Sequence, residues 1–147
     1  MPSMIDVDVS RTMNASPDAV WAVIHDLPRL AEWLAFAAEV QDVSGPADAG
    51  ATYSVKPHKS YEPTTHWVVA ESQAPARQLH TSEMPIVAGV RSELTVTPQD
   101  GGGCTVRAHW TGTPKGFMGR IMGGTMRKRI AENWETSLAE LERLATG

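Results

Sequence analysis

The period of the apolar and polar positions changes along the chain, and these changes divide it into strands and helices. Residues 4–13 alternate between apolar and polar side chains, which is typical of a half-buried strand. Ser16 and Pro17 then indicate a helix start, because serine caps a helix and proline fits its first turn. Pro28 interrupts this helix, and a second short helix is predicted over residues 29–34.

The middle of the chain has the short alternating runs and the proline- and glycine-rich turns of a sheet. The predicted strands cover residues 38–44, 50–57, 61–71, 77–83, 90–97 and 105–111. Because the turns between them are short, neighbouring strands are predicted to run antiparallel.

The last part of the chain, residues 115–144, has the period of a long amphipathic helix. Its apolar residues recur at spacings of four and three, and the predicted inner stripe is Met118, Met122, Met126, Ile130, Trp134, Leu138, Leu141 and Ala145, widened by Phe117 and Ile121. Four glycines lie in its first half, where each costs roughly 1 kcal/mol relative to alanine. They indicate either tight packing on the sheet or, with the methionines, an adaptable wall beside a cavity.

Strand alternation assigns side chains to the two faces of the predicted sheet. If each turn is centred on its glycine and proline residues, His80 lies opposite Glu93 and Glu93 opposite His109, on an outer polar face with His66 nearby. The inner face then collects an apolar set with a few polar members, which includes Tyr53, Trp67, Thr81, Glu83, Ser92 and Trp110. A curved antiparallel sheet packed on one long helix is an α+β fold, and the length of the chain predicts a single domain over residues 1–147.

Composition and charge indicate a globular protein with no general affinity for nucleic acid. The 147 residues are 41% hydrophobic and 20% charged, with a formal charge of −4, whereas a general nucleic-acid binder needs a basic surface. The single cysteine, Cys104, excludes an intramolecular disulfide and fits a cytoplasmic location. No apolar leader and no run of about 18 apolar residues is present, so neither secretion nor a membrane span is predicted.

Candidate chemistry is sparse. The sequence has no HExxH, GxGxxG, CxxC, GxSxG or P-loop motif, and neither a cofactor nor a metal is predicted. His66, His80, Glu93 and His109 could cluster, but on an outer face a polar ladder across the strands is favoured over a metal site. Glu83 would anchor a ligand or move a proton if it pointed inward, whereas at the rim of the sheet it would be an ordinary solvated carboxylate.

Two stretches in the first helical region resemble a known superfamily. Residues 14–21 (NASPDAVW) and 26–33 (DLPRLAEW), with Gly103 and the terminal Leu138, Leu141 and Leu144, resemble the START-like, helix-grip (Bet v 1-like) superfamily. Its members include bacterial polyketide cyclase/dehydrase and lipid-transport (SRPBCC) proteins. The resemblance spans nearly the whole chain. It implies a seven-stranded curved antiparallel sheet around the C-terminal helix (β-α-α-β6-α), with a cavity between them for apolar ligands, and it carries over no catalytic residue.

The predicted function is therefore the binding of a hydrophobic or aromatic small molecule, lipid- or polyketide-like, between the sheet and the C-terminal helix. Aromatic residues would form the walls, methionines an adaptable side, and hydroxyl or carboxyl groups would orient the ligand. The predicted ligand-binding residues are Trp33, Phe36, Tyr53, Trp67, Thr81, Glu83, Ser92, Trp110, Met118, Met122 and Met126.

Two other functions stay open at this point. The same pocket could act as a polyketide cyclase, aromatase or dehydratase, with Glu83 or Tyr53 as the first catalytic candidates. Alternatively, the resemblance extends to toxin-like or chaperone-like modules that bind macromolecular assemblies, and Arg120, Arg127, Lys128 and Arg129 would then form the binding surface. Both a monomer and a homodimer are compatible with the sequence.

Overall fold

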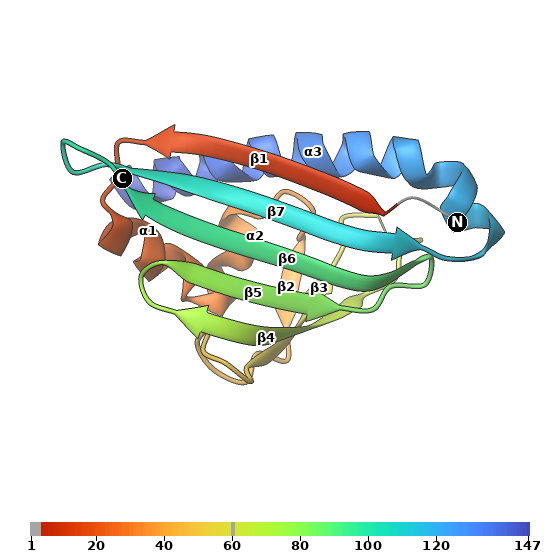
Figure 1. Ribbon diagram of the computed structural model, residues 1–147. Coiled ribbons are helices and arrows are strands. Elements are labelled where there is room, and N and C mark those ends of the chain that lie inside the picture. Colours follow the sequence, from red (N-terminus) through yellow and green to blue (C-terminus); the bar gives the residue numbers. More distant parts are fainter. Residues whose placement is uncertain (1–3, 60) are drawn as a thin grey trace.

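The computed structural model describes residues 4–59 and 61–147, and within them seven strands form one antiparallel sheet in the order β1-β7-β6-β5-β4-β3-β2. The strands are β1 (Ile5–Met13), β2 (Glu39–Gln41), β3 (Thr52–Lys56), β4 (Thr65–Gln73), β5 (Arg77–Ser82), β6 (Val87–Pro98) and β7 (Cys104–Pro114). The helices are α1 (Pro17–Ile24), the 3-10 turn η1 (Leu27–Arg29), α2 (Leu30–Trp33) and α3 (Gly116–Thr146). The curved sheet packs against α1, α2 and α3 on one side (Figure 1), which confirms the predicted α+β helix-grip fold.

The first helical region forms where the sequence predicts it. The hydroxyl oxygen of Ser16 accepts a hydrogen bond from the Ala19 N–H at 3.1 Å, and Pro17 occupies the first turn of α1. The second predicted helix is split, because the residues around Pro28 form η1 before α2 begins at Leu30. Together α1, η1 and α2 lie between β1 and β2 in sequence and supply one wall of the interior.

The predicted facing of β5 is wrong by one residue. His80 pairs with Ser92 rather than Glu93, so its side chain points inward, and Thr81 points outward opposite Arg91. The misleading signal was Leu79, an apolar residue that lies in the outer row opposite Glu93, where Arg77 bonds to that carboxylate. Because side chains alternate with period two, one leucine on the outer face is enough to reverse the predicted facing of every residue in β5.

The predicted apolar stripe on α3 is also partly wrong. Phe117, Met118, Ile121 and Met122 are exposed, whereas the buried residues of α3 are Gly119, Trp134, Ser137, Leu138 and Leu141. The helical period explains the difference, because each step of four residues advances about 40° around the axis. Five such steps separate Met118 from Leu138, a rotation of roughly 200°, so the two residues cannot share one face.

Gly119 shows why the start of α3 contains glycine. A Cβ atom at this position would lie 2.6 Å from the carbonyl oxygen of Ile86, so close approach of α3 to the β5–β6 connection requires glycine there. A Cβ atom at Gly124 would have no heavy atom within 4 Å. Tight packing therefore accounts for Gly119 and gives no reason for Gly124.

Candidate functional site

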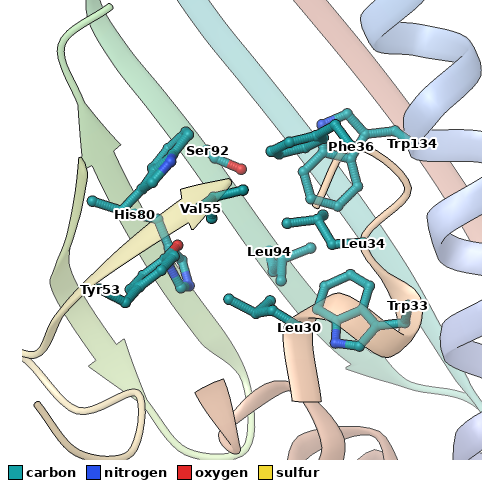
Figure 2. Close-up of a pocket in the computed structure, with 11 residues that line it drawn as sticks. Leu30, Trp33, Leu34, Phe36, Tyr53, Val55, His80, Ser92, Leu94 and Trp134 are labelled. Carbon is teal, nitrogen blue, oxygen red and sulfur yellow. The ribbon is translucent and has the colours of Figure 1, made fainter. Parts of the chain in front are cut away.

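A cavity lies between the inner face of the sheet, the region around α2, and the middle of α3 (Figure 2). Its volume is about 20 Å³, which is enough for about one water molecule. Nine of its lining residues are apolar or aromatic, including Tyr53 with its hydroxyl, and the other two are His80 and Ser92. The lining consists of Leu30, Trp33, Leu34, Phe36, Tyr53, Val55, Trp67, His80, Ser92, Leu94 and Trp134.

Two aromatic pairs face each other across this cavity. On the sheet side, the rings of Tyr53 and Trp67 are stacked with centroids 6.4 Å apart and an interplanar angle of 9°. On the helical side, Trp33 of α2 and Trp134 of α3 have centroids 6.3 Å apart at 48°. Such walls suit planar apolar molecules, because they offer large contact area with little conformational entropy to lose.

A buried hydrogen-bond chain runs along the sheet wall. The hydroxyl of Tyr53 lies 2.7 Å from Nδ1 of His80, and Nε2 of His80 lies 2.8 Å from Oε1 of Gln78. Because Oε1 can only accept, Nε2 carries the imidazole proton and Nδ1 accepts from the Tyr53 O–H. Rotation of the Gln78 amide would reverse both bonds and leave the Tyr53 proton free for another acceptor.

Burial keeps both titratable members of this chain uncharged at neutral pH. It lowers the pKa of His80 to about 4, because the protonated imidazole would lose its hydration without gaining a counter-charge. It also raises the pKa of Tyr53 far above its ordinary value of 10.0. Tyr53 is therefore a hydrogen-bond donor, and His80 is a neutral acceptor that stays neutral well below pH 7.

Ser92 is the other polar group of the lining. It is 7% exposed and pairs with His80 on β5 and Trp110 on β7. Figure 2 shows its hydroxyl pointing from the sheet toward the side of the cavity formed by Leu34 and Phe36. A ligand in the cavity could exchange a hydrogen bond with this hydroxyl.

The segment after α2 closes the cavity and is fastened from two sides. The Ala35 N–H donates to Oγ of Ser137 on α3 at 2.8 Å, and Ser137 in turn donates to the carbonyl oxygen of Asn133 at 2.6 Å. From the β3–β4 connection, Nε2 of His58 lies 3.1 Å from the Ala35 carbonyl oxygen and donates to it. This segment carries Leu34 and Phe36, so its position sets the size of the cavity.

The structure brings together some of the predicted ligand-binding residues and separates others. Those that line the cavity are Trp33, Phe36, Tyr53, Trp67 and Ser92. Trp110 is on the inner face but packs beside Gly112, outside the lining. Met118 and Met122 are exposed on α3, and Met126 is half-buried against the core without reaching the cavity.

Thr81 and Glu83 do not reach the cavity, which corrects their predicted inward orientation. The side chain of Glu83 is 67% exposed, accepts a hydrogen bond from the Gly89 N–H at 2.7 Å, and lies 3.8 Å from Nζ of Lys115. Glu83 is therefore a solvated carboxylate at the rim of the sheet, the alternative to an inward anchor. Tyr53 is thus the member of the predicted catalytic pair that lies in the lining.

His80 was missed as an inner residue. Gln78, His80 and Ser82 alternate along β5, and this polar alternation could have identified one face, but Leu79 suggested the opposite one. The register between β4 and β5 also shifts between Val69 and Glu71, so counting residues from β4 does not give the correct partner of His80.

Comparisons with known proteins agree with this architecture. Residues 4–146 match the family model described as polyketide cyclase / dehydrase and lipid transport. Among curated proteins, none matches the chain significantly. The matching solved structures include the Zhui aromatase/cyclase from Streptomyces sp. R1128, with 16% identity, a TM-score of 0.77, and coverage of 98% of this chain and 94% of that one.

Two further solved structures are longer than this chain. The di-domain aromatase/cyclase StfQ from the steffimycin biosynthetic pathway has 13% identity and a TM-score of 0.81 over 97% of this chain and 51% of its own. DynU16, described as a putative protein in the dynemicin biosynthetic locus, has 19% identity and a TM-score of 0.68 over 95% and 46%. This chain therefore spans about half of each. The match over residues 4–146 shows that the chain belongs to the polyketide cyclase/dehydrase and lipid transport family.

Proposed function

We propose that the protein binds a hydrophobic or aromatic small molecule in the cavity between the sheet and α3. The observation that carries the proposal is the pair of aromatic walls, Tyr53 with Trp67 and Trp33 with Trp134, around a space that few polar groups enter. The family match supports a ligand of the same broad kind.

The cavity must widen to accept such a ligand, because about 20 Å³ holds no molecule of polyketide or lipid size. Moving the segment after α2 breaks the hydrogen bonds that Ala35 makes with Ser137 and His58, at about 1 kcal/mol each. Burying about 300 Å² of apolar ligand surface would return about 7 kcal/mol. The gain exceeds the cost of breaking these two hydrogen bonds, so ligand burial offsets their loss.

Three buried N–H groups favour a ligand that carries oxygen acceptors. Nε1 of Trp33, Nε1 of Trp134 and Nε2 of Gln78 have no acceptor among the residues that the structure describes. An unsatisfied buried donor costs about 1–3 kcal/mol. Two of the three belong to the cavity lining, so a carbonyl-bearing molecule could offset a cost that a plain hydrocarbon would leave in place.

Native mass spectrometry of protein purified gently from its own host tests the binding proposal. The expected result is a bound apolar small molecule, released on denaturation, and its absence from Ser92→Leu, which fills the cavity from the sheet side. Ser10→Leu is the matched control, because Ser10 is exposed on β1. A ligand-free protein whose melting temperature is unchanged by a panel of aromatic compounds and lipids would contradict the proposal.

A second candidate function is cyclisation of a carbonyl-rich chain in the same cavity, favoured by the Tyr53–His80 hydrogen bond. Loss of a proton to water from the carbon between two carbonyls creates an enolate, whose carbon attacks another carbonyl and forms a ring, and the resulting alkoxide takes a proton back from water. The developing oxygen anion needs a preorganised donor, and the uncharged Tyr53 hydroxyl would be that donor once rotation of the Gln78 amide frees its proton from His80. Turnover of a β-keto thioester that survives unchanged in Tyr53→Phe would remove this assignment.

A further inference from the structure

The first two turns of α3 expose four large apolar side chains. Phe117 is 77% exposed, Ile121 61%, Met118 54% and Met122 37%. They project about 160° away from the buried face of Trp134, Leu138 and Leu141, if 100° is taken for each residue. Core packing therefore gives no reason for them, and clustered apolar side chains on a surface mark an interaction site.

The same part of α3 concentrates positive charge. Residues 115–131 contain five basic residues and no acidic residue, and the remaining 8 basic and 17 acidic residues leave the rest of the chain at −9. The five are Lys115, Arg120, Arg127, Lys128 and Arg129. Arg120, Arg127 and Lys128 form no ion pair with any residue that the structure describes. This charge separation within an acidic protein indicates a partner of negative charge.

The backbone adds to this positive field. The first turn of α3 has no acidic residue and no side-chain cap, so the positive end of the helix dipole is not neutralised within the described chain. Lys115 at the N-cap places a cation at this end, which works against helix stability. An external anionic surface would reverse that penalty.

We propose that this surface, formed by Phe117, Met118, Ile121 and Met122 with Lys115, Lys128 and Arg129 on the same side of α3, docks the protein on an anionic lipid surface. Apolar side chains flanked by lysine and arginine are the composition of helices that lie in a membrane interface. Each nearby cation contributes about 1 kcal/mol on an anionic leaflet, so three cations together with four apolar side chains suffice for reversible docking. In the described residues no helix is long and apolar enough to cross a membrane.

The docking surface continues toward the segment that closes the cavity. Arg129 lies seven residues after Met122, which places it in the same row of the helix, about 10 Å along the axis. Its guanidinium bonds to Glu62 of the β3–β4 connection at 2.7 Å. The same connection carries His58, which bonds to the Ala35 carbonyl oxygen. Docking would thus bring lipid close to the opening of the cavity, although the docking itself stands independently of any ligand.

A second copy of the chain fits the surface less well than lipid. The acidic second half of α3 could pair with the basic first half of another copy, but its outward residues include Glu132, Glu135 and Glu140. Such a contact would cover Phe117 and Ile121 with carboxylates instead of apolar groups, whereas a lipid interface accommodates both the charges and the apolar side chains.

Vesicle co-sedimentation tests the proposal directly. The protein is mixed with vesicles of phosphatidylcholine alone or of phosphatidylcholine with phosphatidylglycerol, at low and high salt. We expect binding only to the phosphatidylglycerol vesicles, weakened by salt. Lys128→Glu with Arg129→Glu should weaken it by at least fivefold for each cation lost, and Phe117→Ser with Ile121→Ser should reduce it at least tenfold.

The controls use positions on the outer face of the sheet. Val68→Ser removes an exposed apolar side chain, and Arg91→Glu reverses an exposed cation on β6. Both variants should bind vesicles as the wild type does. Absence of vesicle binding at low salt, or equal loss in the controls and in the α3 variants, would overturn the proposal. Concentration-dependent dimerisation that Phe117→Ser with Ile121→Ser abolishes, without vesicle binding, would assign the surface to a second copy of the chain instead.

Discussion

The buried imidazole of His80 predicts an acid-dependent loss of stability. Its pKa in the folded protein is about 4, below its ordinary value of 6.5, because the site provides no hydration for the charged form. In the unfolded chain the imidazole is solvated and protonates near its ordinary value. The neutral His80 therefore contributes its full stability above pH 6.5, and this contribution is lost as the pH falls from 6.5 through 4.

The magnitude follows from the two pKa values. Between them the unfolded chain binds more protons than the folded protein, so the free energy of unfolding falls by about 1.4 kcal/mol for each pH unit. The total loss amounts to about 3 kcal/mol below pH 4. Small domains have roughly 5–15 kcal/mol of stability, so this single group is a substantial part of it.

Urea unfolding at a series of pH values measures the effect, with His80→Gln as the comparison. The variant should lose most of the pH dependence between 6.5 and 4.5, whatever its stability at neutral pH. That window lies above the range in which the carboxyl groups of Asp8 and Glu142, whose pKa values are lowered by Arg107 and by the Asn14 N–H, become protonated. The control variant His109→Gln, on the outer face of the sheet, should keep the pH dependence of the wild type. Equal slopes for wild type and His80→Gln would refute the burial argument.

Two further predictions concern packing and the closing segment. Gly119→Ala should destabilise the protein by about 1–3 kcal/mol in thermal unfolding, because the added Cβ would meet the Ile86 carbonyl oxygen. Gly124→Ala should stabilise it by about 1 kcal/mol, because alanine favours the helix and its Cβ meets no neighbouring atom. The opposite order of stabilities would show that this description of α3 packing is wrong. Ser137→Ala should lower the free energy of unfolding by about 1–3 kcal/mol and speed the exchange of a bound ligand, because it leaves the Ala35 N–H without its acceptor. An unchanged melting temperature and ligand exchange rate would argue against the role of Ser137 in holding the segment after α2.

Much of the fold could be predicted from the sequence because its signals are local. The Ser16–Pro17 start of α1 depends on a cap and a fixed φ within four residues, and the structure forms both. The period-two pattern of residues 4–13 likewise needs no knowledge of distant contacts, and β1 covers Ile5–Met13. The existence of α3 follows from its length and its second half, where Trp134 and Leu138 are buried.

The candidate site was harder to predict because it depends on register and rotation, which accumulate errors along an element. A single outward leucine at position 79 reversed β5 and hid His80. On α3, a stripe with a strict spacing of four rotates about 40° at each step, so methionines assigned to the cavity face solvent. Tyr53 and Trp67 were placed inside because both strands of their pair contain aromatic and β-branched residues with one consistent alternation.

The corrected register changes the chemistry expected of the ligand. An inward Glu83 would have offered a charge to a cationic group, but the titratable side chains of the described lining are His80 and Tyr53, and burial keeps both the imidazole and the phenol neutral. An ionised ligand group buried there would lose its hydration without a counter-charge, at a cost of several kcal/mol. Within the proposed function, the cavity should therefore select neutral molecules. A fatty acid would have to leave its carboxylate outside, whereas a ketone or a quinone could enter completely.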